Sequence, residues 1–193
     1  NRRAIANAGP FKMLVQQLRS ESAKVKMLAA AVMANLSGDS EENVAQIAAA
    51  NGVKPLVALL NAEDGETQAH SAAVLADMAK RSQEHADIIQ KEGAIPFLVR
   101  LLQEGQGVEV MGVAADVLGS IAVSYAVEVG ESGAILPLVE LLKSDSVNAQ
   151  KKAACAIANV AGGGQKNQDD VETAGGIELL VSLLGECDEN QDN

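Results

Sequence analysis

The stretch Gly133–Leu142 reads G-A-I-L-P-L-V-E-L-L, and four other segments of the chain repeat its pattern. The copy at Gly93–Leu102, G-A-I-P-F-L-V-R-L-L, is nearly identical. Aligned on their Leu-Val pair, the five copies begin at positions 9, 51, 93, 133 and 175, which we call the anchors. Spacings of 40 to 42 residues are typical of solenoids, in which each unit packs only on its neighbours.

Each copy predicts three helices around its anchor. A short polar lead-in helix comes first, and it ends at the anchor because Gly and Asn tolerate positive φ. The second helix begins next: all four prolines lie one to four residues after an anchor, where a first helical turn has free N–H groups. Its apolar residues recur two, five, six and nine positions after the anchor, which gives one helical stripe. An Ala-rich third helix follows a polar hinge.

The repeats also predict the domain organisation. We expect one array over residues 1–184, whose units span approximately 1–38, 39–81, 82–124, 125–163 and, in part, 164–184. The remaining 185–193 are acidic and lack periodicity, so we expect a disordered tail. Copy three carries an additional residue near Gly105–Gly107, which partly offsets a shortened lead-in and is interpreted as a loop insertion. Copy five stops after its second helix, which predicts either an exposed apolar end or missing sequence.

The composition restricts the function classes. The chain has no Trp, one Tyr and two Phe, which favours thin layers of aliphatic helices over a single core with large aromatic fillers. Its net charge is −11, although residues 1–37 hold six Lys or Arg against one acid, Glu21. So acidic a body repels a phosphate backbone, and we expect no nucleic-acid partner. We interpret the chain as part of a longer protein, in which a preceding segment balances the positive charge of this end.

The cysteines and the apolar runs indicate the cellular compartment and whether the chain enters a membrane. Cys155 and Cys187 show no paired spacing, which indicates neither a disulfide framework nor a zinc site and favours the cytoplasm, with the nucleus as an alternative. No apolar run approaches the roughly 18 residues needed to cross a bilayer, and no signal-peptide pattern is present. We therefore expect no direct membrane insertion.

Copy four shows most fully the pattern Gly-x-Ile-x-x-Leu-Val-x-Leu-Leu followed by an Ala-rich helix, at Gly133–Leu142 and Ala153–Val160. This pattern resembles the armadillo repeat, and the similarity covers the chain apart from its last nine residues. The resemblance implies an all-α fold, a right-handed superhelix of three-helix repeats. It also implies a concave groove, lined by the third helices, that holds an extended peptide or protein segment.

In armadillo proteins a ladder of Asn side chains on the third helices holds the peptide backbone, since an amide is both donor and acceptor. The matching positions, which we call the ladder positions, are Asn35, Asp77, Ser120 and Asn159. Only the two ends are Asn. Family members that bind lysine-rich signals also carry Trp one turn earlier. This chain instead has Ala31, Ala73, Asp116 and Cys155 there, so we expect no such lysine slots.

Charged residues on the third helices bear on the partner. The middle of the groove would hold Glu66, Asp77, Glu109 and Asp116, which favours a basic or mixed-charge segment, although a solvated helix face explains the same acids. The ends would hold Lys24, Lys151 and Lys152, which are suited to acidic residues of the partner or simply solubilise the chain.

No pattern of catalytic or metal-ligating residues stands out. The run Gly162–Lys166 lacks the Ser or Thr and the strand of a phosphate loop, and His70 and His85 have no partner at metal spacing. We therefore predict a non-enzymatic adaptor without cofactor or metal, either monomeric or making end-to-end contacts. The alternative is a structural segment of a larger assembly, of a ciliary, ubiquitin-ligase or chaperone-regulator type, that docks through its convex face or its repeat ends.

Overall fold

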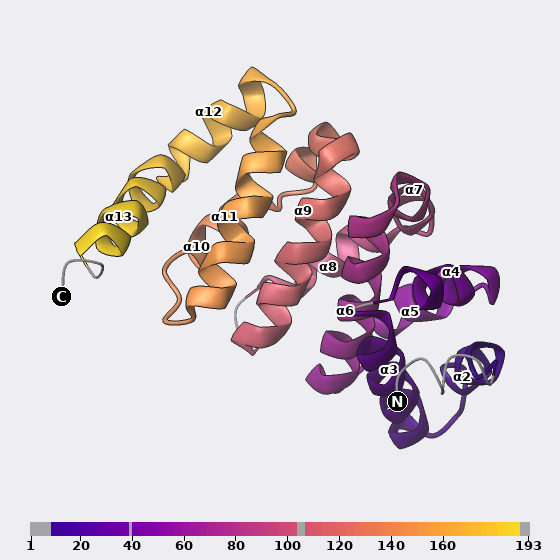
Figure 1. Cartoon of the computed structure of the whole chain (residues 1–193). Coiled ribbons are helices and arrows are strands. Elements are labelled where there is room, and N and C mark those ends of the chain that lie inside the picture. The colour runs from indigo at the N-terminus through magenta and orange to yellow at the C-terminus, as the bar shows by residue number, and fades with distance from the viewer. Residues whose placement is uncertain (1–8, 39, 104–106, 190–193) are drawn as a thin grey trace. The chain divides into compact units, whose positions relative to one another are not determined.

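The computed structural model describes residues 9–38, 40–103 and 107–189, and these form α-helices and connecting turns without any strand (Figure 1). The chain divides into two compact units, residues 1–101 and 102–193. In both units a long third helix packs on a second helix and on a lead-in helix, as the repeat pattern predicts.

The first unit contains the second and third helices of copy one, all of copy two, and the first two helices of copy three. The third helices α3 and α6 pack along one another, the second helices α2 and α5 pack on α3 and α6, and α7 packs against α5, α6 and α8. The elements are α2 (Phe11–Gln17), α3 (Ala23–Ser37), α4 (Glu41–Ala49), α5 (Val53–Leu59), α6 (Gly65–Arg81), α7 (Gln83–Lys91) and α8 (Ala94–Leu101).

The second unit is organised around the pair α9 and α11, which lie side by side in Figure 1. Helix α10 packs on both, and α12 contacts α10, α11 and α13. The elements are α9 (Val108–Glu131), α10 (Ile135–Leu141), α11 (Val147–Ala161), α12 (Gln165–Thr173) and α13 (Gly176–Glu189).

All five anchors adopt the left-handed backbone conformation that the sequence predicts. Asn51, the one anchor that is not glycine, has φ of 56°, and the four anchor glycines have φ between 69° and 81°. From the second copy on, the anchor turns the chain from a lead-in helix into a second helix. The prolines lie at the N-cap or in the first turn of these second helices, which confirms that they mark helix starts.

Substitution of Gly93 by Ala is expected to lower the free energy of unfolding by about 1 kcal/mol, because a Cβ is disfavoured at its φ of 77°. A Cβ at Gly93 would meet no atom within 4 Å, so the cost is conformational and not steric. Urea denaturation followed by circular dichroism measures it. The control is Asn51→Gly, which relieves strain and should leave stability equal or higher; equal stability of Gly93→Ala and wild type would contradict the interpretation.

The boundary between copies three and four lies at Tyr125, where the repeat pattern places the start of the fourth unit. The element α9 holds both the third helix of copy three and the lead-in helix of copy four, and the two helices meet at a kink at Tyr125, whose backbone is not helical (φ −123°, ψ 37°). The shortened lead-in leaves no room for a turn, so the kink replaces it. The predicted loop insertion near Gly105 lies largely outside the described residues.

The two helices of α9 together bear on the expectation that no apolar run could cross a bilayer. At 24 residues, α9 contains an 18-residue window with a mean hydropathy of 1.7, enough by length and composition alone to cross a membrane. More than half of that window is buried, and α9 packs extensively against α11. We therefore assign α9 to the core of the second unit.

The core is aliphatic, as the composition predicts. The second-helix stripe is largely buried in the first four copies, with Leu56, Leu98 and Leu138 fully enclosed. In copy five the same stripe is open, with Ile177 49% and Val181 64% exposed, which confirms the expected apolar end. Helix α13 continues to Glu189, so the helix extends beyond residue 184, where the array was expected to end and a disordered tail to begin.

Two buried asparagines, Asn43 and Asn167, each join a lead-in helix to the third helix that precedes it. Asn43 Nδ2 donates to the Leu36 carbonyl (2.8 Å), and Asn167 Nδ2 donates to the carbonyls of Val160 (2.7 Å) and Ala126 (2.9 Å). Both lie eight residues before an anchor. Both asparagines donate to the carbonyl seven residues earlier, Leu36 or Val160. This carbonyl belongs to the last turn of a helix, where carbonyls lack intrahelical partners.

His85 occupies the same register position in copy three, and its buried Nδ1 has no hydrogen-bond partner among the described residues. We expect His85→Asn to raise the free energy of unfolding by about 1 kcal/mol, because the amide can donate to the Met78 carbonyl seven residues earlier. Thermal denaturation tests this. His85→Ala, which cannot donate, serves as the control, and the interpretation is wrong if Asn and Ala at position 85 give the same stability.

Candidate functional site

In the first unit the ladder positions Asn35 and Asp77 lie on the packed third helices α3 and α6. Asn35 is exposed, and its side chain makes no hydrogen bond within the described residues. Asp77 is half-buried and accepts a hydrogen bond from the Ser37 hydroxyl, with 2.6 Å between Oγ and Oδ2. The Arg81 guanidinium, one turn further along α6, donates to the Gly38 carbonyl at 2.6 Å. The acidic ladder position therefore joins two third helices.

In the second unit the ladder positions Ser120 and Asn159 lie on α9 and α11. Asn159 is exposed, and its Nδ2 donates to the Gly119 carbonyl of the neighbouring third helix at 2.9 Å. Within the described part of the chain nothing donates to its Oδ1. The Ser120 hydroxyl donates to the main-chain carbonyl of Asp116 at 2.8 Å, within its own helix. Asn159 thus has one acceptor and one N–H left for a ligand.

Small residues bring α9 and α11 close enough for this bond. A Cβ built on Gly119 would lie 2.9 Å from the Ala156 Cα, and one on Gly112 would lie 3.4 Å from the Ala149 Cβ. Both glycines and both alanines are seven residues apart, so they form one stripe on each helix. The contact fixes the carbonyl of Gly119 beneath Asn159.

The predicted acidic residues occupy different environments. Glu66 and Glu109 are exposed in the first turns of α6 and α9, where a negative charge also stabilises the helix N-terminus. Asp77, itself a ladder position, and Asp116, one turn before Ser120, are half-buried. The first pair is therefore explained without a ligand, whereas the second pair lies half-buried on the third helices α6 and α9.

The predicted basic residues lie in the N-terminal halves of the third helices α3 and α11. Lys24 is exposed in the first turn of α3, and Lys151 is exposed on α11. Lys152 is half-buried, with its aliphatic stem beside Gly112 of α9. Its packing role was not foreseen from the sequence.

Other reactive groups do not form a site in the part of the chain that the structure describes. No group of three His, Cys, Asp or Glu residues is placed to hold a metal ion there. Cys155 is an exposed free thiol on α11. The described geometry therefore offers amide and carboxylate groups on the third helices.

Sequence reasoning missed the contacts between third helices. The Ser37–Asp77 bond and the Asn159–Gly119 bond each join residues 40 apart, so only the repeat alignment could bring them together. Gly119 was a usable signal, because a glycine inside an Ala-rich helix costs helix stability and implies a close approach.

These features define a class: an all-helical repeat scaffold in which neighbouring third helices share a polar surface. The family model of the Armadillo/beta-catenin-like repeat matches residues 125–162. A designed armadillo repeat protein is 30% identical, with a TM-score of 0.84 over 94% of this chain and 77% of that one. The chain belongs to the armadillo repeat family, and its fold is the α-solenoid of that family.

Two further solved structures are similar. One is an engineered protein from the Northeast Structural Genomics Consortium, 35% identical, with a TM-score of 0.84 over 95% of this chain and 75% of that one. The other is a designed armadillo repeat protein in complex with the peptide (KR)4, 29% identical, with a TM-score of 0.82 over 94% and 77%. A comparison with curated proteins gives no match.

Proposed function

We propose that this chain is a non-catalytic adaptor, in the cytoplasm or the nucleus, that binds an extended peptide of basic or mixed charge along its third helices. The observation that carries the proposal is the pair of exposed amides, Asn35 and Asn159, at the same register of two third helices. An exposed amide offers a peptide unit both a donor and an acceptor. The designed neighbour that holds (KR)4 supports a peptide ligand.

The charge of the ligand follows from two half-buried acids on the third helices α6 and α9. Asp77 keeps one carboxylate oxygen outside its bond with Ser37, and Asp116 lies one turn before Ser120 on the same helix. Carboxylates that are only half-exposed are screened less by salt than surface ones, so they attract a cation more strongly. Lysine or arginine side chains of a bound peptide would meet these groups.

The double substitution Asp77→Asn and Asp116→Asn is expected to weaken binding of a fluorescein-labelled (Lys-Arg)4 peptide by about tenfold at low salt, and to flatten its salt dependence. Asparagine keeps an acceptor for the Ser37 hydroxyl, so the helix contact survives. Fluorescence anisotropy gives the dissociation constants.

The matched control for this experiment is the pair Glu84→Gln and Glu172→Gln. It makes the same change in net charge, with one exposed acid on the lead-in helix of each unit. Its affinity for the peptide should stay within about twofold of wild type. Equal weakening by the two double variants would show a general charge effect and contradict the proposed site.

The open stripe of α13 favours a second candidate function, docking into a larger assembly through this repeat end. Ile177 and Val181 are exposed at positions where the first four copies have buried residues, apart from half-exposed Val99. Sedimentation velocity of wild type and of Ile177→Ser with Val181→Ser tests whether the stripe drives association. Equal monomer fractions in both samples over a wide concentration range would exclude self-association through it.

A further inference from the structure

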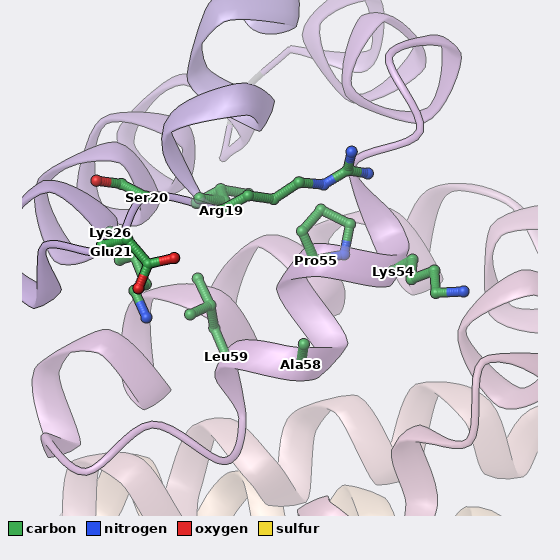
Figure 2. Close-up of a pocket in the computed structure, with 9 residues that line it drawn as sticks. Arg19, Ser20, Glu21, Lys26, Lys54, Pro55, Ala58 and Leu59 are labelled. Carbon is green, nitrogen blue, oxygen red and sulfur yellow. The ribbon is translucent and has the colours of Figure 1, made fainter.

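A pocket of about 420 Å³ lies in the first unit, away from the ladder positions (Figure 2). It is formed by the C-terminal end of α2, the turn that follows, the start of α3 and one side of α5 along its length. The volume is within the range of pockets that hold small ligands or peptide side chains, about 300–1,000 Å³. We call it the α2–α5 pocket.

Three cationic side chains line this pocket: Arg19, Lys26 and Lys54. Within the described residues none of the three side chains makes an ion pair or a hydrogen bond. Other cations of this acidic chain do have partners: Lys143 pairs with Glu140, for example. The pocket therefore gathers three cations against one carboxylate, that of Glu21, in a protein whose net charge is −11.

The floor of the pocket is apolar. Leu18, Pro55 and Leu59 line it, and all three are buried, so their positions are fixed by the packing of α2 and α5. Ala58 adds a small exposed side chain. A ligand that only neutralised charge would leave this apolar surface uncovered, whereas one with an apolar group would gain from covering it.

The three cationic groups lie on two separate sides of the pocket. Figure 2 shows the ends of the Arg19 and Lys54 side chains on one side of the pocket and Lys26 with Glu21 on the other, with Pro55, Ala58 and Leu59 between them. A compact anion such as phosphate is held by donors that converge on one point. Separated cations around an apolar floor instead match separated carboxylates on both sides of an apolar side chain.

We propose that the α2–α5 pocket binds an acidic peptide segment in which carboxylates flank an apolar residue. The proposal is independent of the peptide site on the third helices, since it uses other residues and the opposite ligand charge. It also gives a role to the basic character of residues 1–37, which includes Arg19 and Lys26.

The probe for this proposal is a fluorescein-labelled peptide, Asp-Asp-Leu-Phe-Asp-Asp, followed by anisotropy at low ionic strength. The full chain should bind it saturably, and Lys26→Glu with Lys54→Glu should weaken binding by about tenfold or more. A second probe with Gly-Gly in place of Leu-Phe should bind about tenfold more weakly, because it cannot cover the apolar floor.

The control variant is Lys12→Glu with Lys91→Glu, which makes the same charge change at exposed sites of the first unit outside the pocket. It should stay within about threefold of wild type. The proposal is overturned by absence of saturable binding, by equal weakening in both variants, or by equal affinity for the two probes. Displacement of the probe by millimolar inorganic phosphate at constant ionic strength would instead show a simple anion site, which also contradicts it.

Discussion

Substitution of Asn167 by Ala is expected to lower the free energy of unfolding by about 3 kcal/mol, because it leaves two buried carbonyls without donors. Asn167 is 2% exposed, and its one amide nitrogen serves Val160 at the end of α11 and Ala126 beside the kink of α9. The amide is also enclosed by Gly130 and Gly163, where any Cβ would overlap it. No neighbouring side chain can replace it.

Urea denaturation of the full chain measures this loss. The matched control is Asn148→Ala, the same chemical change at an exposed position of α11, which should alter stability by less than about 0.5 kcal/mol. A loss at position 167 no larger than that at position 148 would show that the buried amide does not hold the three helices together.

The second large effect is expected at the contact between α9 and α11. Gly119→Ala places a Cβ at 2.9 Å from the backbone of Ala156, and overpacking against a backbone costs about 1–3 kcal/mol. Alanine gains about 1 kcal/mol over glycine in a helix interior, which offsets part of that cost. We expect a net loss of up to about 2 kcal/mol, together with a longer Asn159–Gly119 bond.

Gly112→Ala is the control for this prediction, since it makes the same change on the same face of the same helix. There the nearest atom of α11 is at 3.4 Å, an ordinary contact, so the helix propensity of Ala should dominate. Stability should be unchanged or about 1 kcal/mol higher. Opposite signs at the two glycines are expected in thermal denaturation, and the same sign at both would contradict the packing account.

The repeat pattern predicted the fold well because backbone conformation at the anchors depends on local chemistry. Asn51, the one departure from glycine, still adopts positive φ. The order of lead-in, second and third helices was equally predictable. The position of the boundary inside α9 was predictable too, but the kink at Tyr125 that takes the place of a turn was not.

The candidate site was only partly predictable. Register alone identified Asn35 and Asn159, but the partners of Asp77 and Asn159 depend on the distance between neighbouring third helices. The α2–α5 pocket was missed for a related reason. Lys54 belongs to another copy than Arg19 and Lys26, and the sequence shows a basic segment without showing what surrounds it.

The central claim is that exposed amides on the third helices hold a peptide backbone. The most direct measurement is the nuclear magnetic resonance of nitrogen-15 labelled protein during titration with unlabelled (Lys-Arg)4 peptide. The side-chain amide signals of Asn35 and Asn159 should shift and saturate, while those of the buried Asn43 and Asn167 stay in place. Saturable binding that leaves the Asn35 and Asn159 signals unmoved would contradict the account.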